Sequence, residues 1–129
     1  NTLLPKTIIP QFNKCVKEIT EKYCITAISY GHAGDGNVHV NILKGTEDNP
    51  AWERNLDKAI REIFKLTVSL GGMISGEHGI GYSQKNYLGI ALGEGELGLM
   101  RNIKAVFDPK NILNPGKIFP DNPENPDKE

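Results

Sequence analysis

The chain has 129 residues, of which 38% are hydrophobic, and a formal net charge of −1. This length fits one domain or part of one, and the composition is compatible with a globular fold. A charge so close to zero does not favour nucleic acid or an anionic membrane as partner, and no apolar run approaches the roughly 20 residues of a membrane span.

The chain begins at Asn1 rather than at a methionine, and no signal peptide opens it. We therefore expect a processed or excised piece of a longer protein. Cys15 and Cys24 have neither metal-binding nor redox spacing, and two cysteines do not make a disulfide framework. We expect them to be free thiols that pack inside an intracellular, cytoplasmic protein.

The first half of the chain is predicted to contain a helix and a hairpin. Residues 10–23 place apolar side chains at helical spacing. Residues 25–32 are rich in β-branched and aromatic types, which is typical of a strand, and residues 37–43 are its expected hairpin partner.

A long helix is predicted to follow. Asn49 can cap it, and Pro50 is a favoured first helical residue. Gly71-Gly72 is the expected end, because glycine adopts the left-handed conformation that closes many helices. The apolar stripe recurs with a period of 3.6 residues, and it consists of Trp52, Leu56, Ala59, Ile60, Ile63, Phe64 and Leu70.

The last third is predicted to alternate short elements with one clear helix. Residues 73–75 are expected to form a short strand, and residues 83–91 leave a short helix and a loop both open. Residues 94–107 are predicted to be a helix with acids in its first turn, and Asp108-Pro109 stops it. The acidic, proline-rich tail 120–129 is expected to be disordered.

The predicted order is helix, strand, strand, helix, strand, helix. This order indicates an α+β fold with an antiparallel sheet packed on helices. Three strands leave the sheet edges exposed, so a further part of the sheet is expected from sequence outside this chain or from a partner chain.

Two of the three histidines flank a glycine-rich turn in the segment Gly-His-Ala-Gly-Asp-Gly-Asn-Val-His, residues 31–39. Asp35-Gly36 is a favoured type I′ hairpin turn. In such a turn His32 pairs with His39, with their Cβ atoms about 5 Å apart on one sheet face. That spacing suits joint binding of one metal ion, whereas a four-residue loop would shift the register and spoil the pairing.

Alternation along the strands separates an apolar face from a polar one. The predicted core face consists of Val38, Val40 and Ile42, and the opposite face of Tyr30, His32, His39 and Asn41.

Glu77 is the natural third ligand, because catalytic zinc often binds two histidines and one glutamate. It lies in the glycine-lined segment Gly76-Glu77-His78-Gly79, where the backbone can approach closely. His78 would stay free of the metal and act as general base for a substrate hydroxyl. The alternatives to a metal site are that the histidines only stabilise loops and that Glu77 is simply solvated.

Three segments, in order, carry a resemblance to a known family. They are the histidine turn, then Ser-Gly-Glu-His-Gly-Ile-Gly, then Phe-Asp-Pro-Lys-Asn-Ile-Leu-Asn-Pro-Gly-Lys-Ile. Together they resemble the C-terminal domain of FAD-linked oxidases, in the vanillyl-alcohol oxidase flavoprotein superfamily. The resemblance implies a partial ferredoxin-like domain over residues 1–119.

The resemblance also implies site roles. A divalent metal, most often zinc, would be bound by His32, His39 and Glu77. Asn41 would contact the substrate, His78 would be the base, and Asn114 would lie near the isoalloxazine ring of the flavin. The chain departs from the family at Gln84, where many members have lysine, although Lys85 is adjacent.

The implied whole enzyme is a flavin-dependent 2-hydroxy-acid dehydrogenase or oxidase that acts on glycolate, D-lactate or a similar acid. FAD would be bound mainly by a domain absent here, in the same chain or another, so this chain alone is expected to be inactive. Homo-oligomerisation and peripheral membrane association of the full enzyme stay open. The alternative is a stand-alone, non-catalytic metal-binding or interaction module.

Overall fold

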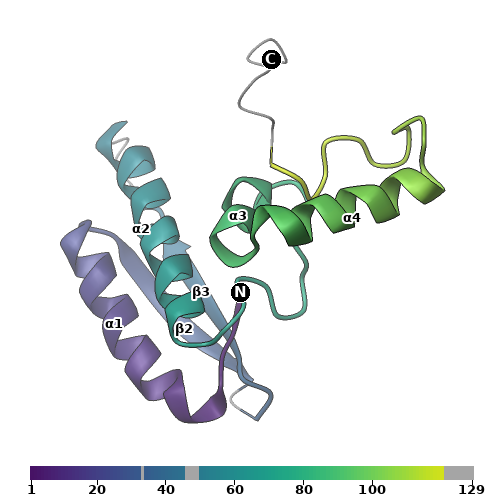
Figure 1. Ribbon diagram of the computed structural model, residues 1–129. Coiled ribbons are helices and arrows are strands. Elements are labelled where there is room, and N and C mark those ends of the chain that lie inside the picture. The colour runs from purple at the N-terminus through teal and green to yellow at the C-terminus, as the bar shows by residue number, and fades with distance from the viewer. Residues whose placement is uncertain (33, 46–49, 121–129) are drawn as a thin grey trace. The chain divides into compact units, whose positions relative to one another are not determined.

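The computed structural model describes residues 1–32, 34–45 and 50–120. The chain divides into two compact units, Asn1–His78 and the part that begins at Gly79. The described elements of the first unit are β1 (Thr2–Leu3), α1 (Ile9–Lys22), β2 (Thr26–His32), β3 (Asn37–Leu43) and α2 (Pro50–Ser69). Those of the second are α3 (Leu88–Ala91) and α4 (Glu94–Phe107), with a short 3-10 turn before α3 (Figure 1).

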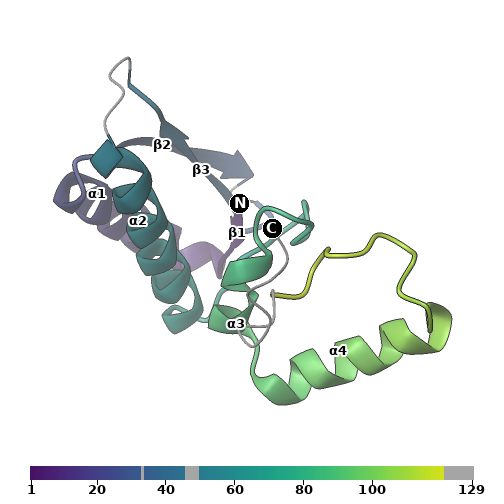
Figure 2. The same cartoon turned by 90° about the horizontal axis from the view of Figure 1, so that it is seen from above.

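The first unit is a two-layer structure. Its antiparallel sheet has the strand order β1-β3-β2, and α1 and α2 lie side by side on one face of it (Figure 2). The core between the layers is built from Leu4, Phe12, Val16, Ile19, Ile25, Val38, Ala59 and Ile63. The α+β prediction, with an antiparallel sheet on helices, is therefore confirmed.

The hairpin prediction is right about the strands and wrong about their register. His32 pairs with Asn37 and Tyr30 pairs with His39, so the strands part earlier than a two-residue turn at Asp35-Gly36 allows. The loop is closed by the Asp35 N–H, which donates to the His32 carbonyl at 2.9 Å. The predicted pair of His32 with His39 does not form.

Gly36 provides the physical reason. Its φ is +78°, and its carbonyl accepts a hydrogen bond from the Leu4 N–H at 2.8 Å. A Cβ on Gly36 would lie 2.2 Å from the Leu4 carbonyl oxygen. This glycine therefore serves the contact with the N-terminal segment rather than a two-residue turn.

The register error spans two residues, so it leaves the faces of the strands unchanged. Val38 is buried, and Val40 and Ile42 pack against the core, as predicted. Tyr30 and His39 lie opposite each other on the other face.

The end of α2 also agrees with the prediction. The Gly72 N–H donates to the Thr67 carbonyl and the Gly71 N–H to the Val68 carbonyl, at 2.9 and 3.0 Å. With Gly71 at φ +76°, these bonds form a Schellman motif. The helix begins at Pro50, as predicted, while its proposed cap Asn49 falls outside the described residues.

The third strand was assigned to the wrong segment. Residues 73–75 make a single bridge, between Met73 and Leu3, and the third strand is β1. Two hydrogen bonds form this bridge, from the Leu3 N–H to the Met73 carbonyl at 2.9 Å and from the Met73 N–H to the Leu3 carbonyl at 2.8 Å.

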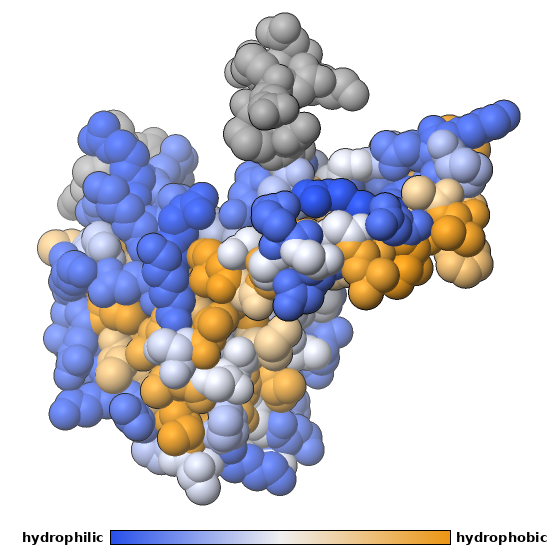
Figure 3. Space-filling view, viewed as in Figure 1, coloured by the Kyte–Doolittle hydropathy of each residue, from blue (hydrophilic) through white to orange (hydrophobic). Residues whose placement is uncertain are grey.

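The second unit contains the predicted helix 94–107 without change, and residues 85–91 resolve the open segment as helical. Along α4, Leu97 is buried, whereas Leu99, Ile103, Val106 and Phe107 are more than half exposed. Apolar side chains gather along one side of this helix (Figure 3). The predicted disordered tail lies almost wholly outside the described residues.

Candidate metal centre

Three side chains of the first unit converge at one point. His39 comes from β3, and Glu77 and His78 come from the segment after α2. The Glu77 Oε1 lies 3.2 Å from the His39 Nε2 and 3.5 Å from the His78 Nε2. One ligand atom of each residue lies within 4.8 Å of the others.

A polar network holds the Glu77 segment against β3. The buried Asn37 side chain accepts a hydrogen bond through its Oδ1 from the Asn1 Nδ2 at 2.9 Å. The Asn1 Oδ1 in turn accepts from the Gly76 N–H at 3.4 Å. A Cβ on Gly76 would lie 2.7 Å from the Asn37 Oδ1, so a larger residue would have to displace the Asn37 side chain. The next residue, Glu77, is thereby brought to His39.

Aromatic contacts fix the imidazole of His39 from the other side. The Tyr30 ring stacks on it, with 5.3 Å between the ring centroids and 20° between the planes. The His32 ring meets it edge-on at 6.3 Å, and the His78 ring lies at 5.4 Å. The Asn41 amide donates through its Nδ2 to the Tyr30 hydroxyl oxygen at 3.0 Å.

The structure thus brings together most of the residues that the sequence singled out. His39 and Glu77 are in contact as expected, and Asn41 shares their face. His32 contacts the ring of His39 but is not part of the ligand group, whose third member is His78. The displaced register explains the difference, since His32 lies opposite Asn37 instead of His39.

The donor set fits a divalent metal. Two imidazole nitrogens and one carboxylate oxygen are the ligands of many catalytic zinc sites, which keep a further position open. Imidazole also suits iron, nickel and copper, and carboxylate suits manganese. The His39 side chain is 15% exposed and that of Glu77 is 51% exposed, so a small molecule can reach the group.

Asn114 lies in the second unit, in the loop after α4. Its φ is +47°, a left-handed conformation that asparagine tolerates better than most residues. Asp108 organises this loop, because its carboxylate accepts hydrogen bonds from the Ile112 and Leu113 N–H groups at 2.9 and 3.0 Å. It also accepts a hydrogen bond from the Lys104 ammonium.

Those contacts hold the pKa of Asp108 below its usual range, Lys104 being the largest cause and the backbone donors adding to it. From the sequence, Asp108 is predicted only to stop the helix of residues 94–107. Its role in the loop has a local signal, because an aspartate at the end of a helix readily accepts hydrogen bonds from backbone N–H groups a few residues later.

Lys85, which neighbours the family's lysine position, is buried in the second unit. Its Nζ lies 4.6 Å from the centroid of the Tyr82 ring, and the Nζ of Lys117 lies 4.8 Å from the same centroid. No local sequence pattern indicates this arrangement.

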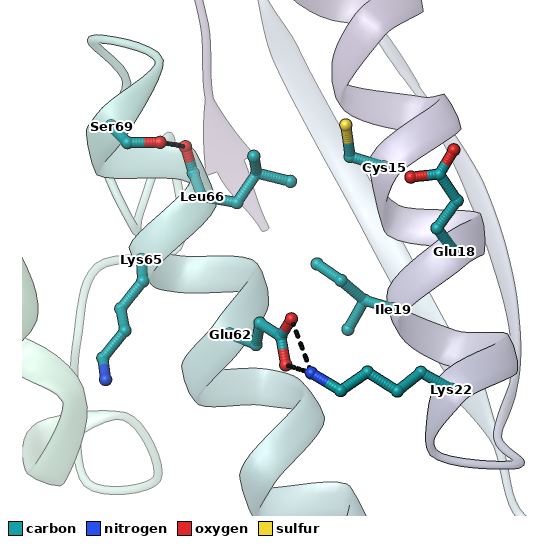
Figure 4. A pocket seen from close by; sticks show the side chains of 8 residues that line it. All are labelled: Cys15, Glu18, Ile19, Lys22, Glu62, Lys65, Leu66 and Ser69. Atoms are coloured by element: carbon teal, nitrogen blue, oxygen red, sulfur yellow. Dashed lines mark hydrogen bonds and ion pairs between the residues drawn. The ribbon is translucent and has the colours of Figure 1, made fainter.

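A separate groove runs between α1 and α2, with a volume of about 490 Å³ (Figure 4). The Lys22 ammonium contacts both Glu62 oxygens across it, at 2.8 and 3.1 Å. The Tyr23 hydroxyl donates to Glu62 as well, and these hydrogen bonds, with that from Lys22 the larger, lower the pKa of Glu62. The described lining of the groove contains none of the predicted site residues, and its ion pair links α1 to α2.

The comparisons with known proteins agree with the motifs. The family model described as FAD linked oxidases, C-terminal domain, matches residues 2–118. The glycolate oxidase subunit GlcD of Bacillus subtilis is 40% identical over 90% of this chain and 24% of its own length. A D-lactate dehydrogenase of Archaeoglobus fulgidus is 45% identical over 89% of the chain and 25% of its own length.

A D-2-hydroxyglutarate dehydrogenase of Stutzerimonas stutzeri is 36% identical over 86% of the chain and 25% of its own length. The chain therefore spans about a quarter of the length of the curated relatives it matches. The family resemblance expected from the three motifs is confirmed.

Proposed function

The chain belongs to the family of FAD-linked oxidases, C-terminal domain, and from this premise we propose that it is the substrate- and metal-binding part of a flavin-dependent 2-hydroxy-acid oxidoreductase. The names of the three relatives above all refer to enzymes of 2-hydroxy acids, namely glycolate, D-lactate and D-2-hydroxyglutarate. The flavin would be bound mainly by a domain outside this chain, in cis or in trans.

The observation that carries the proposal is the convergence of His39 with Glu77, 3.2 Å apart, on the open face of the sheet. Both residues belong to the set proposed from the sequence. In that set His32 is the third ligand of a divalent metal, for which zinc is the first candidate. The neighbouring His78 does not bind the metal and acts as the base. The ring of His32 lies beside that of His39, with 6.3 Å between the centroids, so this arrangement requires the His32 side chain to move toward Glu77.

The structure offers a second arrangement of the same site. Here His78 is the third ligand, because its Nε2 already lies 3.5 Å from the Glu77 Oε1. His32 would then be the free imidazole beside the metal. The two arrangements share His39 and Glu77 and exchange the roles of the other two histidines.

The residues of this chain would divide the work as follows. His39 and Glu77 would hold the metal, and Asn41 would offer its amide to a substrate oxygen. The free histidine accepts the hydroxyl proton on its ring nitrogen. When bound, the metal lowers the pKa of the substrate hydroxyl, and FAD accepts the hydride. Asn114 is proposed to lie near the flavin.

A reducing compartment suits the chain, since Cys15 and Cys24 are both free thiols. We place the enzyme in the cytoplasm. None of the helices in the described part of the chain is long and apolar enough to cross a bilayer.

A second candidate function is a non-catalytic metal-binding module. It is favoured by the fact that the whole histidine and glutamate cluster lies within one compact unit of this chain. In this case the cluster would bind metal in a chain that works without FAD and catalyses no reaction.

Oxidation of D-lactate and glycolate with a dye as electron acceptor separates the two candidates. The assay requires this domain together with its FAD-binding domain. Turnover in the assembled enzyme that is lost in both His78→Ala and His39→Ala supports the oxidoreductase. Metal binding with no flavin-dependent turnover of any 2-hydroxy acid supports the module instead.

A further inference from the structure

Tyr30 lies at the centre of the contacts around His39, and none of the roles proposed above belongs to it. It is the direct cross-strand partner of His39 in the ladder between β2 and β3. Such pairs bring side chains on one face into contact. Here the two rings are stacked, with 5.3 Å between the centroids and 20° between the planes.

The two stacked residues differ in their exposure to solvent. Tyr30 is 55% exposed, whereas the His39 side chain is 15% exposed. The ring of Tyr30 covers the imidazole of His39, and the Nε2 of that imidazole faces Glu77 at 3.2 Å.

The hydroxyl of Tyr30 makes a second connection. It accepts a hydrogen bond from the Asn41 amide at 3.0 Å. A phenol that accepts through its oxygen still has its own proton to donate. One side chain therefore joins the proposed metal ligand His39 to the proposed substrate contact Asn41.

We propose that Tyr30 is a positioning residue of this site, whose ring fixes the His39 imidazole and whose hydroxyl fixes the Asn41 amide. The two roles belong to different atoms of the same side chain, so they can be removed separately. The proposal rests on the proposed function, because it assumes that His39 binds a metal.

Two variants separate the roles. Tyr30→Phe keeps the ring and removes the hydroxyl, whereas Tyr30→Leu removes both. Tyr82→Leu is the matched control, since Tyr82 is a similarly exposed tyrosine that belongs to the other unit. Circular dichroism and the melting temperature of each variant establish that it is folded.

The first readout is the dissociation constant for Zn²⁺ by titration calorimetry, together with the visible spectrum of the Co²⁺-substituted chain. We expect Tyr30→Phe and Tyr82→Leu to bind Zn²⁺ as the unmodified chain does. Tyr30→Leu should bind about 2- to 10-fold more weakly, which is the range for loss of an aromatic pair. Its Co²⁺ spectrum should also change, because the imidazole is no longer held in one orientation.

The second readout needs no metal. In nuclear magnetic resonance spectra, Tyr30→Phe should shift the side-chain amide protons of Asn41 and leave the ring protons of His39 near their original positions. Tyr30→Leu should move both sets, because the ring current of the tyrosine is lost.

The proposal is overturned if Tyr30→Leu, although folded, leaves the Zn²⁺ affinity, the Co²⁺ spectrum and the His39 ring protons unchanged. His39→Ala distinguishes this failure from that of the proposed function. If His39→Ala abolishes Zn²⁺ binding while Tyr30→Leu has no effect, only the role of Tyr30 is refuted. If His39→Ala leaves Zn²⁺ binding intact, the proposed metal site is refuted, and the proposal that Tyr30 positions a ligand of that site is refuted with it.

Discussion

The two units of this chain solve the problem of burying apolar side chains in different ways. In the first unit, a sheet and two helices enclose a core that includes the fully buried Phe12. In the second unit, the side chain of Phe107 at the end of α4 is 80% exposed, and the loop after it is held by hydrogen bonds to one carboxylate. The proposed ligands lie on the unit with the closed core, which suits residues that need fixed positions.

The largest expected effect contrasts two phenylalanines. Phe12→Ala should reduce the free energy of unfolding by about 3–5 kcal/mol, because it leaves a cavity in the core. Phe107→Ala should change it by less than about 0.5 kcal/mol. Urea denaturation of both variants measures this difference. A substantial loss in Phe107→Ala would mean that the face of α4 is covered in solution.

The approach of the Glu77 segment to β3 gives the next prediction. In Gly76→Ala the new methyl group meets the Asn37 Oδ1 at 2.7 Å, so Glu77 should move away from His39. We expect the affinity for Zn²⁺ to fall about 10-fold, as for other residues that orient metal ligands. Gly34→Ala is the control, since a Cβ there meets nothing within 4 Å. Equal affinities in calorimetric titrations of the two variants would contradict this account of the site.

A third prediction concerns only the second unit. Asp108→Asn should loosen the loop after α4, because the carboxylate that accepts from Lys104, Ile112 and Leu113 is lost. Trypsin should then cleave at Lys110 or Lys117 faster than in the unmodified chain, while Zn²⁺ affinity should not change. A drop in Zn²⁺ affinity would show that the two units depend on each other.

The same carboxylate predicts a pH dependence. The pKa of Asp108 is lowered in the folded chain, so its stabilising effect is fully present above its ordinary pKa of about 4. This effect is lost as the pH falls through the lowered folded value. Protection of the Ile112-Leu113 segment from an acid-active protease, which cleaves beside large apolar residues, should therefore decrease only below about pH 4. Loss of this protection near neutral pH would contradict the role of the Asp108 carboxylate.

The smallest effect is expected at the ion pair between α1 and α2. Glu62→Gln removes the charge that Lys22 contacts at 2.8 Å, but both side chains are at least one-third exposed. Pairs of this kind contribute little, so the melting temperature should fall by no more than about 3 °C. Calorimetry at low and high salt checks this, since screening should remove most of the difference between variant and unmodified chain.

Local signals were sufficient to predict most of the elements. The helix of residues 94–107 was placed without error, because Glu94 and Glu96 mark its start and Asp108-Pro109 its end. The end of α2 was equally clear from Gly71. These signals act within a few residues of the element they define.

The errors came from contacts between distant residues. Local turn rules favoured Asp35-Gly36 as a two-residue turn, but the hydrogen bond between Gly36 and Leu4 depends on the N-terminal segment. The position of His78 beside Glu77 and His39 depends on the chain of contacts from Asn37 through Asn1 to Gly76. Neither interaction has a signature in the local sequence. The polar face was still predicted correctly, because a register error of two residues does not move side chains to the other face of the sheet.

The central claim is that His39 and Glu77 bind a divalent metal, and metal content measures it most directly. Mass spectrometry of the purified chain after exposure to Zn²⁺ should find about one ion per chain. The ion should be absent from His39→Ala, and comparison of His32→Ala with His78→Ala should show which histidine is the third ligand. Equal metal content in the unmodified chain and in His39→Ala would contradict the account.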